Sequence, residues 1–226
     1  GEPGAESTEP PGQQLAHTIQ RALHLSPSRS QSTEDRRHVL AELVRNQQIV
    51  LDLARRSTGD FDAFLRDLTA QAAAAIQVAR TSVWDFDATG ARLRCAAMYR
   101  LDTDHHESGS VIEGHPRYRA ALDSALQIAA TDAWIDPRTS EFFADYLKPL
   151  DIRAMLDAPI RANGRVIGVL CFEHTGTTRV WTLLEQCLAA SLASVLARAF
   201  AERDRRHYEA LTNRNDKLAA LGRLTA

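Results

Sequence analysis

The residues best suited to chemistry in this 226-residue chain are three cysteines and a cluster of histidines and acids. Cys95, Cys171 and Cys187 form no Cys-x-x-Cys pair, and their spacing predicts no zinc site. An odd number of isolated cysteines favours a reducing compartment and therefore a cytoplasmic location, although a longer parent protein could be attached to a membrane. A redox relay between Cys171 and Cys187 would need two close, exposed thiols, and it is the less favoured alternative.

The histidines lie in a polar stretch that holds the densest group of possible metal or haem ligands in the sequence. These residues are Asp102, Asp104, His105, His106, Glu107 and His115. They show no fixed ligand spacing on a helix or strand, so we favour a solvated loop and expect no metal site. The sequence also has no Gly-x-Ser-x-Gly motif and no phosphate-binding glycine loop, and we expect no catalytic residues in this chain.

The overall composition is that of an ordinary globular protein. The chain has 27 basic and 29 acidic residues, a net charge of −2, and is 44% hydrophobic and 25% charged. This near-neutral balance argues against nucleic-acid binding. The longest apolar run, residues 188–197, contains two serines and ends at Arg198, well short of the roughly 20 residues that span a bilayer. We therefore expect no transmembrane segment and no membrane contact.

Two helices are predicted before the first strand. Residues 1–33 are rich in Pro, Ser, Gly and Gln, which is typical of a flexible linker. Residues 34–58 carry apolar side chains at steps of three and four, which predicts an N-terminal helix that Gly59 ends. Asp60 is a good N-cap for a second helix, whose apolar stripe extends to Ile76.

The middle of the chain changes from helical to strand periodicity. Residues 81–86 and 92–96 alternate around a turn containing Gly90, which predicts a hairpin. We expect a loop over residues 102–114, a helix from Pro116 to Ala125 and a short strand over 127–130. Asp136-Pro137 predicts the start of a further helix, which ends before Pro149.

The clearest hairpin pairs residues 152–161 with residues 165–173 through Asn163-Gly164, which favours a type I′ turn. The continuous apolar run over 166–172 predicts a central strand buried on both faces. Thr182 and Glu185 then form a capping box, and no proline follows it. The sequence thus predicts a very long final helix.

The second half of the chain resembles a GAF domain. The resemblance rests on Thr-Asp-Ala-Trp-Ile-Asp-Pro-Arg at 131–138, on Ile-Arg-Ala-Met-Leu-Asp-Ala-Pro-Ile at 152–160 and on Gly-Arg-Val-Ile-Gly-Val-Leu-Cys-Phe-Glu-His at 164–174. It covers about residues 60–200, so we assign 59–200 to the domain. It implies an α+β fold related to PAS domains, with an antiparallel sheet flanked by helices and a long C-terminal coiled-coil signalling helix.

The final segment, Lys-Leu-Ala-Ala-Leu-Gly-Arg-Leu-Thr-Ala at 217–226, resembles the approach to the phospho-acceptor histidine of bacterial sensor histidine kinases. We interpret residues 201–226 as the start of the kinase dimerisation helix, truncated just before that histidine. The resemblance implies that the parent chain is an ATP-dependent protein histidine kinase. Its partners would be the kinase core and a response regulator in a phosphorelay. We expect no cofactor in this chain itself.

The periodicity of the last helix predicts a parallel homodimer through the N- and C-terminal helices. Apolar and small residues recur at steps of three, four and seven, with one polar Asn layer that would fix the register. The upstream members could instead pack on the sheet or on the N-terminal helix. The predicted dimer helix residues are Leu188, Leu192, Val195, Ala199, Tyr208, Leu211, Asn215, Leu218 and Thr225.

The resemblance also implies a small-molecule pocket between the sheet and the loops around residues 102–148. Aromatic residues there could equally be plain core, and Asp132 could be a turn cap. Three alternatives stay open: a ligand-free dimerisation module, a haem sensor and a redox protein. The predicted pocket residues are Trp84, Met98, Tyr99, Thr131, Asp132, Trp134, Phe142, Phe143, Tyr146 and Met155.

Overall fold

The computed structural model describes residues 29–87 and 89–224, and gives side chains for residues 33–87 and 89–214. The described residues divide into two compact units, one that ends at Val44 and one that begins at Arg45. Helix α2 (Arg29–Arg56) begins five residues before the predicted start of the N-terminal helix. Most of the predicted linker, residues 1–28, lies outside the described residues.

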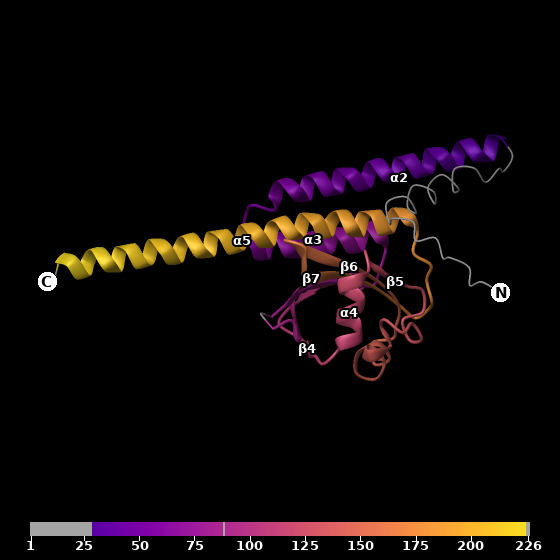
Figure 1. Ribbon diagram of the computed structural model, residues 1–226. Helices are drawn as coiled ribbons and strands as arrows, with labels where there is room; N and C mark the ends of the chain where they lie inside the picture. Colours follow the sequence, from indigo (N-terminus) through magenta and orange to yellow (C-terminus); the bar gives the residue numbers. More distant parts are fainter. Residues whose placement is uncertain (1–28, 88, 225–226) are drawn as a thin grey trace, which may run out of the picture. The chain divides into compact units, whose positions relative to one another are not determined.

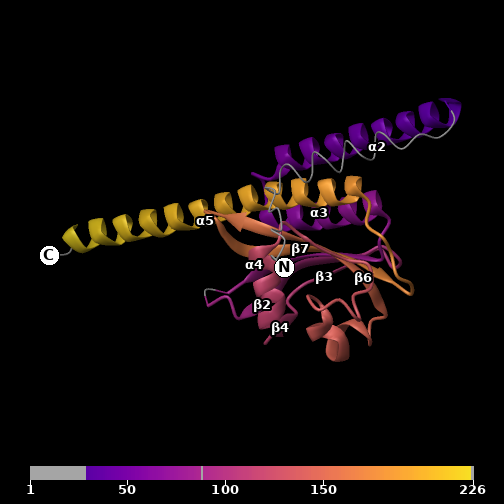
Figure 2. The same ribbon diagram turned by 45° about the vertical axis from the view of Figure 1, so that its right-hand side comes forward.

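The second unit is built on a seven-stranded antiparallel sheet, with helices on both of its faces (Figures 1 and 2). The strand order is β3-β2-β1-β7-β6-β5, and β4 pairs with the far end of β2. The predicted α+β class is confirmed, and β7 is central as the apolar run indicated. The strands are β1 (Arg80–Phe86), β2 (Arg92–Arg100), β3 (His105–Glu107), β4 (Val111–Glu113), β5 (Ile128–Ala130), β6 (Ile152–Ala162) and β7 (Arg165–Thr175).

The two hairpin strands at the centre follow their predicted turn. Asn163 and Gly164 have φ values of 51° and 75°, the left-handed conformation that the type I′ turn requires at both positions. Gly168 on β7 lies so close to β1 that a Cβ atom there would stand 2.3 Å from the Trp84 carbonyl oxygen. Only glycine therefore allows β1 and β7 to pair at this point.

Helices α3 (Phe61–Ile76) and α5 (Leu183–Leu224) cover one face of the sheet. Both begin at the predicted caps. The Asp60 carboxylate accepts a hydrogen bond from the Ala63 amide at 2.9 Å. In the capping box, the Thr182 amide donates to Glu185 at 2.7 Å and the Glu185 amide donates to Thr182 Oγ1 at 3.2 Å.

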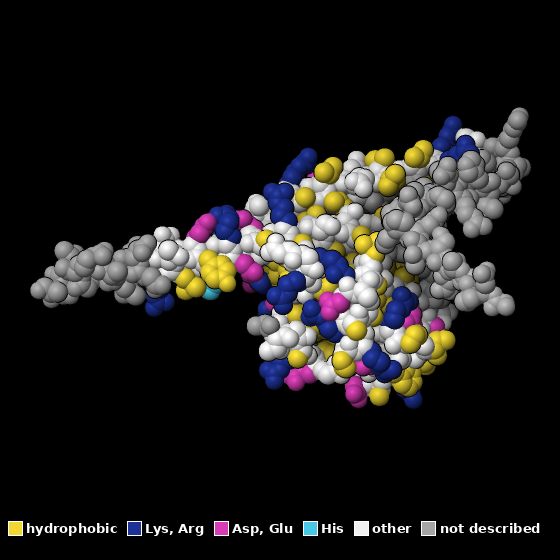
Figure 3. Space-filling model, viewed as in Figure 1, with side chains coloured by type: hydrophobic (Ala, Val, Ile, Leu, Met, Phe, Trp, Pro, Cys, Tyr) yellow, Lys and Arg dark blue, Asp and Glu magenta, His cyan; other side chains and the backbone are white. Residues whose placement is uncertain are grey.

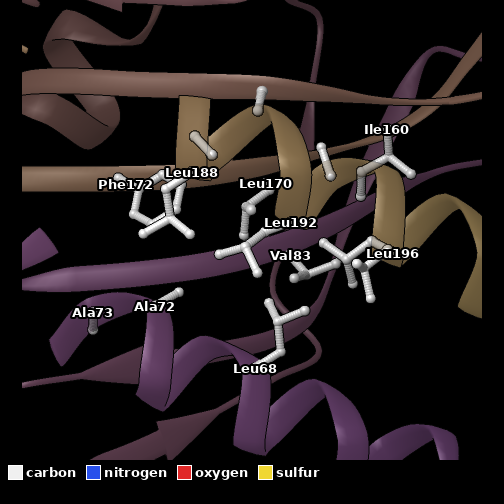
Figure 4. Close-up of a cluster of buried hydrophobic side chains, with 14 of the residues drawn as sticks. Leu68, Ala72, Ala73, Val83, Ile160, Leu170, Phe172, Leu188, Leu192 and Leu196 are labelled. Carbon is white, nitrogen blue, oxygen red and sulfur yellow. The ribbon is translucent and has the colours of Figure 1, made fainter. Parts of the chain in front are cut away.

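The core between these helices and the sheet is aliphatic (Figure 4). Leu68 from α3 and Leu192 from α5 meet Val83 of β1 and Leu170 of β7 there, all of them fully buried. Burial along α5 continues to Phe200 and then gives way to exposed side chains. Four predicted dimer residues lie inside this core: Leu188, Leu192, Val195 and Ala199.

Residues Leu183–Arg214 of α5 are long and apolar enough to cross a membrane by length and composition. A core helix of a folded domain can meet the same criterion, and 44% of the apolar window is buried inside the protein. The buried residues of this window are those that pack against the sheet. The expectation of no transmembrane segment stays a prediction.

The other face of the sheet carries α4 (Pro116–Ser124) and two short helical segments, η1 (Ser140–Phe142) and η2 (Phe143–Leu147). The prediction of one regular helix from Asp136 to Pro149 is corrected here. The Asp136 carboxylate accepts from the Arg138 amide at 2.9 Å, which makes a turn rather than a helix cap. The chain then forms a 3₁₀ turn and a π turn.

The predicted loop over 102–114 is also corrected, because it contains two three-residue strands. β3 and β4 both pair with β2, opposite residues 98–100 and 92–94. Strands this short have almost no periodicity in the sequence. Pairing with an existing edge strand supplies their hydrogen bonds.

Candidate functional site

A cavity of about 20 Å³ lies on the face of the sheet that carries α4, η1 and η2, opposite α3 and α5. This volume holds about one water molecule. Aromatic and aliphatic side chains fill most of the space between the sheet and the segments above it. The lining residues are Trp84, Leu93, Ile112, Tyr118, Phe142, Tyr146, Met155, Val169, Cys171 and Glu173.

A buried ion pair forms one part of the cavity floor. The Glu173 carboxylate, 1% exposed, lies 3.1 Å from Nε of Arg80, which is 11% exposed. The Tyr146 hydroxyl donates to Glu173 Oε1 at 2.7 Å. Burial raises the pKa of Glu173, while Arg80 and the Tyr146 hydroxyl oppose that rise. The pair thus ties β1 and β7 to η2.

A second buried carboxylate lies on the same side of the sheet. Asp157 of β6 is fully buried, and the Tyr118 hydroxyl of α4 donates to its Oδ2 at 2.9 Å. Its other oxygen, Oδ1, has no hydrogen-bond partner among the described residues. Burial raises the pKa of Asp157 to about 7, despite the opposing hydrogen bond from Tyr118. Asp157 is therefore a mixture of neutral and ionised forms near neutral pH.

The structure brings four of the ten predicted pocket residues to the cavity: Trp84, Phe142, Tyr146 and Met155. Two of them come from strands and two from the η1–η2 segment. Phe142 makes an edge contact with the Tyr118 ring at a centroid distance of 4.7 Å. The Trp84 indole is held by a 2.8 Å hydrogen bond from Nε1 to Ser82 Oγ.

Met98 and Tyr99 lie outside the cavity lining. Met98 is buried on the cavity side of the sheet, where its sulfur lies 2.9 Å from an Arg80 nitrogen. Tyr99 packs with the opposite, helix-side core, and its hydroxyl donates to Asp104 at 2.8 Å. Neighbouring strand residues point to opposite faces, so the two could not both face the cavity.

The other four predicted residues form a separate structural corner. Thr131 is exposed. Asp132 caps a turn by accepting from the Trp134 amide at 3.1 Å, and it binds Arg153 at 2.7 Å. The Arg153 guanidinium lies 4.0 Å from the Trp134 ring centroid, and Phe143 meets the same indole edge-on at 5.4 Å. This corner fixes the 131–147 segment to β6.

Sequence reasoning missed six lining residues: Leu93, Ile112, Tyr118, Val169, Cys171 and Glu173. Three of them could have been found from period two along β7, because Val169, Cys171 and Glu173 share one face. The others come from β2, β4 and α4, and only the tertiary arrangement brings them together.

The thiols are poorly placed for redox chemistry. Burial raises the pKa of the Cys95 thiol to about 12 and also raises that of Cys171. Cys187 is exposed on α5. A reactive cysteine normally has a lowered pKa and an accessible thiol, and neither buried cysteine has them.

The histidines of the polar stretch have ordinary surroundings. His105 and His106 are exposed on β3, and the His106 ring lies 4.8 Å from that of Tyr99. His115 stacks on Phe142 at 4.1 Å. Within the described parts of the chain, no group of three His, Cys, Asp or Glu side chains could hold a metal ion.

Beyond the sheet, α5 exposes apolar side chains (Figure 3). Tyr208 is 69% exposed and Leu211 is 43% exposed. Asn215, Leu218 and Thr225 lie outside the residues whose side chains the structure describes. The predicted dimer residues thus fall into two groups. Those up to Ala199 are buried in the domain core, whereas Tyr208 and Leu211 are exposed to solvent.

Comparisons with known proteins agree on one fold. The GAF domain family model matches residues 60–200. The cyanobacteriochrome receptor PixJ is 25% identical, with a TM-score of 0.52 over 61% of this chain and 95% of that one. The phycoerythrobilin-bound GAF domain of a cyanobacterial phytochrome is 15% identical, with a TM-score of 0.61 over 72% and 97%.

A third structure with this fold is an enzyme. The free methionine-R-sulfoxide reductase from Neisseria meningitidis, solved with its substrate, is 15% identical, with a TM-score of 0.58 over 73% of this chain and 93% of that one. No curated protein matches this chain in sequence. At these identities the enzyme and the phytochrome domain support the fold alone.

Proposed function

The chain belongs to the GAF domain family, and from that premise we propose that it is the sensory and dimerisation module of a two-component sensor histidine kinase. A small ligand binds on the cavity face of the sheet. Binding changes the packing of α5, which continues toward the kinase core and controls autophosphorylation. The observation that carries this proposal is α5 itself, one continuous helix that is buried against the sheet up to Phe200 and exposes Tyr208 and Leu211 beyond it.

The cavity must open for such a ligand to bind. Its present volume of about 20 Å³ is far below the roughly 300–1,000 Å³ of typical ligand pockets. The η1–η2 segment supplies Phe142 and Tyr146 to the lining and has no regular α-helical hydrogen bonding. A bilin, as bound by the phytochrome domain, would need a still larger opening.

The dimer forms through the exposed parts of the N- and C-terminal helices. Tyr208 and Leu211 begin the C-terminal contact, and Asn215, Leu218 and Thr225 extend it at steps of three, four and seven. The N-terminal helix α2 offers a second exposed apolar set: Val39, Leu40, Leu43, Val44 and Leu51. An exposed apolar stripe on a long helix is typical of a coiled coil.

The remaining partners follow from the proposed parent protein. The kinase core that α5 leads toward would bind ATP and phosphorylate the acceptor histidine, and a response regulator would receive the phosphoryl group from it. The module works in the cytoplasm, without nucleic-acid or membrane contact. The unremarkable net charge of −2 supports both exclusions.

One observation favours a second candidate function. Side chains nearly fill the cavity, which suits a ligand-free dimerisation module in which the GAF domain only supports the coiled coil. A redox function is the weakest alternative, because burial raises the pKa of the thiols of Cys95 and Cys171.

The dimer is tested by sedimentation equilibrium with the Leu211→Asp/Leu218→Asp variant. We expect a monomer. The matched control is Asn213→Asp/Ala220→Asp, which has the same seven-residue spacing on the opposite side of the helix and should stay dimeric. A dimer that persists in the first variant contradicts the proposal. A thermal-shift screen against a metabolite library separates the two functions, because a bound ligand raises the melting temperature.

A further inference from the structure

The cavity shares a wall with a larger hollow on the protein surface. This groove has a volume of about 520 Å³ and lies between the β1–β2 turn, β4 and α4. Leu93, Ile112 and Tyr118 line both spaces. A shift of these side chains would therefore join the cavity to the groove and produce a pocket of ordinary ligand-binding size.

The lining of the cavity is acidic and aromatic. Trp84, Tyr118, Phe142 and Tyr146 supply four aromatic rings, and Glu173 supplies a carboxylate. None of the described residues that line it is a Lys, Arg or His. The aromatic faces attract positive charge, whereas the Glu173 carboxylate is already paired with Arg80 and accepts a hydrogen bond from Tyr146.

The nearest buried cation, Arg80, is already occupied by the protein. Its guanidinium contacts Glu173 at 3.1 Å and donates to the Tyr146 hydroxyl at 3.3 Å. An anionic ligand such as a phosphate would have to break the buried ion pair to reach it. The groove adds Arg119, which is paired with Asp123 at 2.9 Å, and His115, which stacks on Phe142. An anion would therefore compete with an existing ion pair at both arginines.

Asp157 lies behind Tyr118, outside the linings of the cavity and the groove, and supplies an unfilled acceptor. It is fully buried, its Oδ1 has no hydrogen-bond partner among the described residues, and the Tyr118 hydroxyl and the Cys171 thiol both lie against the carboxyl group. A buried polar atom without a partner costs free energy. An ammonium group can fill both oxygens, and a hydrogen bond between two charged groups is stronger than one from a neutral hydroxyl.

We infer that the ligand of this site is an organic cation, a protonated primary amine on an aromatic body. It enters from the groove, displaces the Tyr118 hydroxyl and donates to Asp157, while its aromatic body packs against Trp84 and Phe142. This inference rests on the proposed function and names the ligand class for the same site.

Binding of such a cation depends on pH. The charged and titratable groups around Asp157 are Tyr118 from α4, Cys171 and Glu173 from β7, and Arg138 from the 131–139 turn. Burial raises the Asp157 pKa to about 7, so this carboxyl is mostly ionised at pH 8 and mostly neutral at pH 6. A cation binds the ionised form, so its affinity falls by about tenfold as the pH drops from 8 to 6.

The test uses three probes that share an indole ring and differ in the end group: tryptamine, indole-3-ethanol and indole-3-acetate. Their dissociation constants are measured by isothermal titration calorimetry on the full chain at pH 8 and pH 6. We expect tryptamine to bind at least about tenfold more tightly than the other two at pH 8. Its affinity should fall about tenfold at pH 6.

Three variants test whether Asp157 is the group that binds the amine. Asp157→Asn keeps the side-chain shape and should abolish both the preference for tryptamine and its pH dependence. Tyr118→Phe removes the competing hydroxyl and should tighten tryptamine binding. Asp52→Asn removes an exposed carboxylate of α2 that lines neither the cavity nor the groove, and it should change neither property. Melting temperatures of all three establish that they are folded.

The inference is overturned if tryptamine binds no more tightly than indole-3-ethanol, or if Asp157→Asn keeps the tryptamine affinity. Tighter binding of indole-3-acetate overturns the ligand class but leaves the sensory function standing. If none of the probes and no metabolite in the thermal-shift screen binds, both the inference and the sensory half of the proposed function are wrong.

Discussion

Removal of Arg80 should destabilise the domain strongly, because it leaves Glu173 charged and unpaired in the protein interior. The two side chains are 11% and 1% exposed, so water screens them little. Unit charges about 4 Å apart attract by about 4 kcal/mol at an effective dielectric constant of about 20. Breaking a buried pair from one side typically costs about 3–5 kcal/mol. We therefore expect Arg80→Met to lower the free energy of unfolding by about 3–5 kcal/mol at pH 8.

The loss should depend on pH in a defined direction. Burial already raises the pKa of Glu173, and Arg80 is the main group that opposes the rise. Without Arg80 the pKa of Glu173 in the folded state rises further above its unfolded value. An acid with a raised folded pKa destabilises the fold as the pH increases through that range. The difference between Arg80→Met and the wild type should therefore shrink as the pH is lowered toward 5.

Urea unfolding followed by far-ultraviolet circular dichroism measures these quantities. The double variant Arg80→Met/Glu173→Gln removes the buried charge and should recover most of the stability. Arg94→Met is the matched control, because Arg94 is 57% exposed in its ion pair with Asp85 and should cost less than about 1 kcal/mol. The reasoning is refuted if Arg80→Met costs no more than Arg94→Met, or if its cost does not change with pH.

Three further predictions concern the scaffold around the site. Gly168→Ala should prevent normal folding, because its Cβ would lie 2.3 Å from the Trp84 carbonyl oxygen; soluble expression with native circular dichroism would contradict this. Thr182→Ala should cost about 1 kcal/mol by removing the cap of α5, as measured by urea unfolding, whereas Thr212→Ala farther along α5 should cost less. Arg203→Ala should cost about 1–2 kcal/mol, because its guanidinium lies 4.9 Å from the Phe61 ring and 4.7 Å from the Phe200 ring; unchanged amide exchange in α5 after Phe200 would count against it.

The parts of the fold that local sequence determines were predicted well. Asp60 and the Thr182–Glu185 box cap their helices as expected, and Asn163-Gly164 makes the expected turn. Each of these features depends on a few neighbouring residues. The 136–148 segment was less predictable, because the Thr139 hydroxyl donates to the Ala133 carbonyl and draws the chain into a turn. The spacing of apolar residues in the sequence gives no indication of that hydrogen bond.

The site was only partly predictable, because its members come from distant elements. Of the aromatic residues predicted for the pocket, Trp84, Phe142 and Tyr146 line the cavity, and the other three do not: Tyr99, Trp134 and Phe143. The aromatic residues did not indicate the two buried carboxylates. Asp157 and Glu173 each lie within a strand and are flanked in the sequence by mostly apolar residues. A charged residue inside a buried strand is itself a signal, because burying a carboxylate is costly unless it is paired or functional.

The adjacent positions Trp84 and Asp85 contact the cavity and α5 from opposite sides of one strand. The Trp84 side chain lines the cavity, and a carboxylate oxygen of Asp85 lies 3.9 Å from Arg203 of α5. Because successive side chains of a strand point to opposite faces, only the β1 backbone separates Trp84 from Asp85. Arg203 stands just beyond Phe200, where α5 leaves the core. Strand β1 thus contacts both the cavity and α5, and under the proposed function it is the strand through which a ligand would act on that helix.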